Sequence, residues 1–77
     1  MDYETAKAIL KERLGSLVFG EEYLNHILRT EIEDGYDPSA MDREAWEKHI
    51  DENVIESVRR SVEEARSGYP PYPYRQH

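Results

Sequence analysis

Apolar residues recur at helical spacing along three stretches of the chain, and these stretches predict its secondary structure. Over residues 2–14 they follow one another at intervals of three and four, as on one face of an amphipathic helix. This face consists of Tyr3, Ala6, Ile9, Leu10, Leu14 and then Leu17. Asp2 is placed to cap the helix and Gly15 to end it. We expect the apolar link at residues 17–19 to fill the core between helices.

A second helix is predicted from residue 20 to residue 34, with Gly35 as its stop. Glu21 and Glu22 stand in its first turn, where the helix dipole favours anions. Its apolar positions again recur at intervals of three and four. They are Tyr23, Leu24, Ile27, Leu28 and Ile32.

The third stretch, residues 39–66, is the longest without Gly or Pro and carries the only tryptophan. We expect Ser39 to cap this helix, because Asp42 follows three residues later and resembles the second member of a capping box. At the other end, Gly68 and the prolines that follow it cannot continue a helix.

The apolar face of this third stretch changes direction along its length. Trp46 and Ile50 mark one direction, and a second stripe lies roughly 100° away at the helical rotation per residue. This second stripe consists of Val54, Ile55, Val58, Val62 and Ala65. A straight helix would bury Glu47 and Asp51 at several kcal/mol each if they were unpaired. We therefore expect a break or kink near residues 51–53, where Asn53 and Glu56 resemble a fresh N-terminal cap; one bent helix and two short helices both fit.

These elements predict an all-α protein, a small bundle of three to four short helices with an extended Tyr/Pro-rich C-terminal tail. The helical domain covers residues 1–67 and the tail residues 68–77. Three prolines in the tail favour an extended polyproline conformation, and its tyrosines supply stiff, amphipathic contact area. We expect the tail to pack on the domain or on a partner, although a terminus without a role is the simpler alternative.

The charge balance narrows the classes of partner. The chain has 17 acidic and 10 basic residues and a net charge of -7. Such a chain is a poor direct ligand for nucleic acid or an anionic membrane, since both are bound largely through Lys and Arg. No apolar run approaches the ~18 residues of a membrane span, and the acidic start is unlike a signal peptide. A cytoplasmic location is the expectation.

Acidic residues are densest between positions 31 and 44, where the only base is Arg43. The six acids are Glu31, Glu33, Asp34, Asp37, Asp42 and Glu44. Three of them crowd the negative end of the second helix, where an anion loses about 0.3–1 kcal/mol. They can be solvated turn and cap residues, a docking face for a basic surface, or a metal site. The last is the weakest, because residues 34–37 lack the pattern of a calcium loop.

Catalytic chemistry has little support in the sequence. The chain has no cysteine, and its isolated glycines form no phosphate-binding loop. His26, His49 and His77 lack the spacing of a zinc enzyme, and we expect the first two to be partly exposed helix residues. No cofactor, no metal and no enzymatic activity are predicted.

The function predicted from these observations is a non-catalytic protein–protein interaction module, that is, a small acidic regulator, inhibitor or adaptor. It would bind a basic partner surface through the six acids between positions 31 and 44 and through Tyr72 and Tyr74. In a more specific version, the carboxylates imitate nucleic-acid phosphates and occupy the groove of a nucleic-acid-binding protein, as small acidic inhibitors from viruses and mobile elements do. That analogy is one of charge and size alone. The alternative is a structural subunit that forms a homo- or hetero-oligomer through apolar helix stripes and the tail.

Overall fold

The computed structural model describes residues 1–18 and 20–66, and every regular element in these ranges is helical. The all-α class predicted from the sequence is therefore confirmed for them, whereas the tail with Tyr72 and Tyr74 lies outside the described residues. In chain order the elements are α1 (Tyr3–Leu14), the 3-10 turn η1 (Gly15–Leu17), α2 (Glu21–Glu33), the 3-10 turn η2 (Pro38–Ala40), α3 (Arg43–His49), the π-helical turn η3 (Ile50–Val54) and α4 (Ile55–Arg66). None of the described helices is long and apolar enough to cross a membrane.

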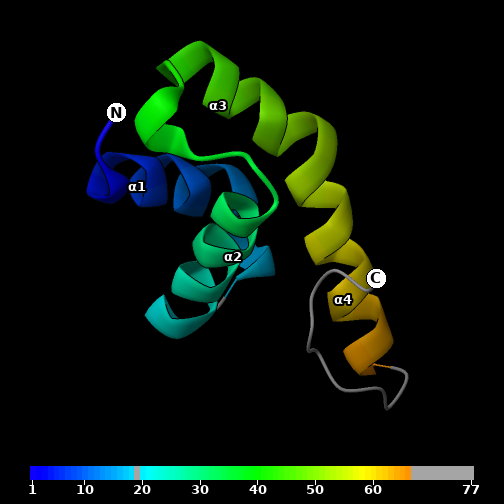
Figure 1. Ribbon diagram of the computed structural model, residues 1–77. Coiled ribbons are helices and arrows are strands. Elements are labelled where there is room, and N and C mark those ends of the chain that lie inside the picture. The colour runs from blue at the N-terminus through cyan, green and yellow to red at the C-terminus, as the bar shows by residue number, and fades with distance from the viewer. Residues whose placement is uncertain (19, 67–77) are drawn as a thin grey trace.

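Three of these elements, α3, η3 and α4, form one continuous curved helical rod (Figure 1). The first two helices, α1 and α2, lie on the inner side of this curve and cross each other there (Figure 1). The segment between α2 and α3 passes back towards the start of α1, where the N-terminal amine donates hydrogen bonds to the carbonyl oxygens of Pro38 at 3.1 Å and Met41 at 3.3 Å.

The boundaries of α1 and α2 agree with the sequence pattern. The Asp2 carboxylate accepts a hydrogen bond from the Thr5 N–H at 2.7 Å, as an N-cap should, and Gly15 ends α1 with a positive φ of 55°. One predicted core position of α1 is wrong. Tyr3 is exposed because it stands at the edge of the fold, where its hydroxyl donates to the Asp37 carboxylate at 3.2 Å.

The start of α3 differs from the prediction. Asp42, rather than Ser39, is the N-cap, and its carboxylate accepts the Ala45 N–H at 2.8 Å. Ser39 belongs instead to η2, a turn that Asp37 caps by accepting the Ser39 N–H at 2.9 Å. The reason is local geometry: Met41 is extended, with φ -121° and ψ 149°, so no α-helix can begin before Asp42.

The change of face expected near residues 51–53 is real, but it is achieved without a break. In η3 the Ile55 N–H donates to the carbonyl of Ile50, the i→i+5 bond of a π-helix. One extra residue in a turn rotates the following face by about 100°, which matches the offset between the two apolar stripes. The predicted cap at Asn53 is therefore wrong, because the backbone stays helical through this turn.

This rotation brings Trp46, Ile50 and most of the second stripe to the core, whereas Ala65, predicted as part of that stripe, is exposed. One arginine compensates the carboxylates beside the two stripes. Arg13 of α1 contacts Glu47 at 3.3 Å and Asp51 at 2.8 Å. Glu47 is partly covered, whereas the side chain of Asp51 remains about half exposed. The predicted cost of burying two unpaired carboxylates therefore does not arise.

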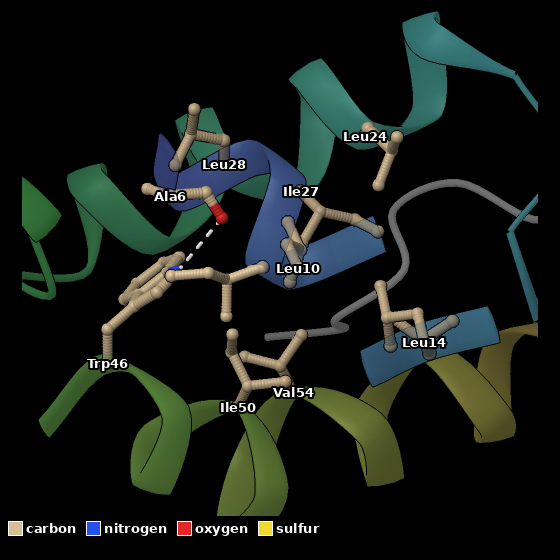
Figure 2. Close-up of a cluster of buried hydrophobic side chains, with 11 residues drawn as sticks. Ala6, Leu10, Leu14, Leu24, Ile27, Leu28, Trp46, Ile50 and Val54 are labelled. Carbon is tan, nitrogen blue, oxygen red and sulfur yellow. Dashed lines mark hydrogen bonds between the residues drawn. The ribbon is translucent and has the colours of Figure 1, made fainter. Parts of the chain in front are cut away.

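The core forms where the rod meets α1 and α2. Figure 2 shows Trp46, Ile50 and Val54 of the rod pointing towards Leu10 of α1. The indole N–H of Trp46 donates to the carbonyl of Ala6 at 3.1 Å, so the largest buried side chain also satisfies its polar atom. The buried apolar residues are Ala6, Ile9, Leu10, Leu14, Leu24, Ile27, Leu28, Trp46, Ile50, Val54 and Val58.

The π-helical turn predicts an unusual tolerance to deletion. Removing the exposed Glu52 leaves the core residues of the rod at intervals of four, three and four, which a regular α-helix can bury on one face. We expect a cost of about 1 kcal/mol, the order of one lost hydrogen bond, in urea unfolding followed by circular dichroism. Deleting the exposed Lys11 is the control. It should cost about 3 kcal/mol or more, because it turns Leu14 out of the core. If both deletions lowered the free energy of unfolding equally, η3 would not serve to rotate the second apolar stripe towards the core.

The position of the α3 cap can be tested by a pair of alanine variants. Asp42→Ala should lower the free energy of unfolding by about 1 kcal/mol, because the Ala45 N–H loses its acceptor. Ser39→Ala, at an exposed residue only three positions away, should change it by less than about 0.5 kcal/mol. Thermal unfolding of both variants is the measurement, and the opposite ranking would place the cap at Ser39.

Candidate functional site

The end of α2 is a Schellman motif, and it sets the position of Tyr36. Gly35 has a φ of 97°, its N–H donates to the carbonyl of Ile32 at 3.1 Å, and the Tyr36 N–H donates to the carbonyl of Glu31 at 2.8 Å. These two bonds satisfy carbonyls that the helix end leaves open. They also hold the backbone of Tyr36 close to the turn that carries Glu31.

Glu31 is buried in the core, together with a histidine of the third helix. The glutamate has no exposed surface and His49 is 6% exposed; the imidazole Nε2 lies 2.6 Å from the Glu31 Oε1. The prediction that His49 is a partly exposed residue is therefore wrong. A buried carboxylate needs a partner, and His49 supplies one at the end of α2, where the helix dipole is unfavourable to an anion.

Asn53 contacts this histidine from the following turn of the helix. The Asn53 amide nitrogen lies 3.5 Å from the backbone carbonyl of His49 and 3.3 Å from its Nδ1. A backbone carbonyl only accepts hydrogen bonds, so the amide NH₂ of Asn53 faces the His49 carbonyl. The imidazole is thus held between Glu31 on one side and Asn53 on the other.

Tyr36 covers this buried pair. Its ring stacks on the imidazole of His49, with 3.9 Å between centroids and 14° between planes, while the residue remains 43% exposed. Trp46 lies on another side of His49, with 5.9 Å between ring centroids. The result is an exposed aromatic ring on a buried polar support.

The other predicted acids lie at or near the surface. Glu33, Asp34, Asp42 and Glu44 are exposed, and Asp37 is half-buried. Glu31 alone is withdrawn into the core, so it cannot belong to an exposed acidic face. We call residues 33–44 the acidic segment. The remaining predicted contact residues, Tyr72 and Tyr74, lie outside the described residues.

Asp37 has a defined place within the acidic segment. It accepts hydrogen bonds from the backbone N–H and the hydroxyl of Ser39 and from the Tyr3 hydroxyl. The backbone hydrogen bond from Ser39 is the main reason why the pKa of Asp37 lies below its usual value. This carboxylate therefore stays ionised.

The N-terminal ammonium offsets part of the charge of the acidic segment, since it donates to the carbonyl oxygens of Pro38 and Met41 and helps to lower the pKa of Asp37. Arg43 directs its Nε to Glu47, 3.0 Å away and outside the segment. In the described part of the chain, Glu33, Asp37, Asp42 and Glu44 form no ion pair with a lysine or arginine. Elsewhere Lys7, Arg13 and Arg59 pair with nearby acids, as Lys7 does with Glu21 at 3.0 Å.

Other places in the fold offer less to a ligand. A depression of about 220 Å³ lies between α1 and α2, but hydrogen bonding to Glu21, which raises the pKa of Lys7, already engages that lysine there. His26 is half-buried beside Tyr23, and burial lowers its pKa. No three His, Asp or Glu side chains converge as metal ligands among residues 1–18 and 20–66.

The sequence contains a signal for the buried pair that the charge pattern obscured. Glu31 follows Ile27 by four residues and Leu28 by three, so it lies on the apolar stripe of α2. His49 likewise follows Trp46 by three residues and precedes Ile50. A polar residue on an apolar stripe requires a partner, and these two polar residues are partners of each other.

Comparison with known proteins adds no relative: no protein-family model matches the chain, and no curated protein or solved structure is significantly similar to it. The chemistry of the site is therefore argued from the chain itself.

The buried pair predicts strong energetic coupling. Glu31→Leu and His49→Leu should each lower the free energy of unfolding by about 3–5 kcal/mol, because each leaves a buried polar partner behind. The double variant should cost about 1–3 kcal/mol less than the sum of the two. Chemical denaturation of all three variants measures this. Glu33→Gln, at an exposed acid of the same helix, is the control and should change stability by less than about 0.5 kcal/mol; strictly additive costs would refute the coupling.

Proposed function

We propose that this protein acts by binding rather than by catalysis, and that its acidic segment docks on a basic surface of a partner protein. The observation that carries this proposal is the group of carboxylates at Glu33, Asp37, Asp42 and Glu44, which have no lysine or arginine partner in the described residues. Surface charge that is mostly of one sign steers association with a surface of the opposite sign.

The structural roles of two of these acids refine the proposal. Asp37 caps η2 and Asp42 caps α3, so their carboxylates are held in place before any partner arrives. Ordered charges lose less conformational freedom on binding than flexible ones. In the most specific form of the proposal, such fixed carboxylates substitute for nucleic-acid phosphates in the basic groove of a nucleic-acid-binding protein.

The alternative function is a structural subunit that assembles through apolar helix stripes. The stripe of the rod gives this alternative little support, because Trp46, Ile50, Val54 and Val58 have no exposed surface within the single chain. We therefore rank it second, together with a role for the Tyr/Pro-rich tail. We also propose that the whole chain is a small helical bundle with an extended Tyr/Pro-rich tail and that the protein is cytoplasmic.

Two variants of equal charge test the docking proposal. The first, Glu33→Gln/Asp34→Asn/Glu44→Gln, neutralises the acidic segment but retains both cap residues. The second, Glu12→Gln/Glu22→Gln/Glu52→Gln, neutralises three exposed acids on other parts of the chain. The probe is a fluorescently labelled oligo-arginine peptide, and its anisotropy gives the affinity at low and at physiological salt.

We expect the first variant to bind the peptide about five-fold more weakly than the wild type, since each exposed charge pair contributes a few tenths of a kcal/mol. The second variant should bind nearly as tightly as the wild type, and all affinities should fall as salt rises. Equal losses in the two variants would show that only net charge matters and would overturn the docking site. A salt-resistant oligomer of the chain alone in light scattering would favour the structural subunit.

A further inference from the structure

We propose that Tyr36 is an arginine-recognition platform, on which the exposed face of the ring receives the guanidinium group of a protein partner. This inference rests on the proposed docking function and names the side chain that the partner inserts. It depends on the position of the ring, on the attraction of its outer face for a cation and on the charges beside it.

The ring is held in one orientation before binding. Its backbone is fixed by the 2.8 Å hydrogen bond to Glu31 in the Schellman motif, and its inner face rests on His49 at 3.9 Å. Because that face is covered while the residue is 43% exposed, the accessible surface is the outer face and the edge. A rigid aromatic ring offers contact area at low entropic cost, which is why tyrosine is common at binding hot spots.

The outer face of the ring itself attracts a cation. His49 covers the inner face, so a cation can approach only the outer one. There it is attracted by the ring quadrupole.

The groups beside the ring favour arginine in particular. Asp34 and Asp37 flank Tyr36 at two residues and one residue in the chain, and hydrogen bonding keeps Asp37 ionised. A guanidinium can stack flat on a ring while its N–H groups donate to carboxylates at the edge, whereas an ammonium is a compact, strongly hydrated charge. A nucleobase could also stack on the ring, but its phosphate would meet like charge.

The experiment compares oligo-arginine with oligo-lysine of the same length and label, so that the acidic segment acts equally on both. An oligothymidine strand is the third probe. The measured quantity is the ratio of the two peptide affinities in wild type, Tyr36→Leu, Tyr36→Phe and Tyr3→Leu. The last variant removes Tyr3, the other exposed tyrosine among residues 1–18 and 20–66, whose hydroxyl donates to Asp37. Circular dichroism checks that each variant is folded.

Wild type should prefer oligo-arginine, and Tyr36→Leu should reduce that preference about three- to five-fold, the order of an exposed cation–π contact. Tyr36→Phe and Tyr3→Leu should retain it. A preference that survives in Tyr36→Leu, or that Tyr3→Leu abolishes equally, would overturn the platform while leaving the docking function in place. Tighter binding of oligothymidine would assign the ring to nucleobases instead. Failure of both peptides to bind would overturn the docking function itself.

Discussion

The buried contact between Glu31 and His49 constrains how the helices of this protein meet. A carboxylate at the negative end of α2 is unfavourable both because of the helix dipole and because of its burial. It is tolerated when a polar partner approaches from another element, and His49 of α3 is such a partner, 2.6 Å away. The third helical segment must therefore pass the end of α2 in one register, with Trp46 one turn earlier against Ala6.

The π-helical turn follows from the same constraint. With His49 and Trp46 fixed against α1 and α2, a regular α-helix would turn the next apolar stripe away from the core by about 100°. The extra residue of η3 restores the direction, and the side chain of Asn53 lies within 3.5 Å of the His49 carbonyl in this turn. Arg13 then compensates the two carboxylates that the curved rod brings near α1.

The proposed docking function involves the acidic residues that lie outside this core. Of the six acids that distinguish the sequence, one supports the fold from within, two cap helical turns, and the rest extend into solvent. Tyr36 connects the two roles, because its inner face covers the buried pair and its outer face lies within the acidic segment. The stability of the fold and the proposed recognition thus involve the same short stretch at the end of α2.

The sequence by itself determined the helical class, the limits of α1 and α2, and the change of face near Asp51, because hydrophobic period, caps and glycines act over a few residues. It did not determine that Asp42 caps α3, because that depends on the extended backbone at Met41. Only the tertiary structure decided that Glu31 and His49 are core residues. They stand 18 positions apart, and no local pattern reports a hydrogen bond between separate helices. From sequence alone, a charged residue is predicted to lie at the surface, and only the structure shows whether a partner allows it to be buried.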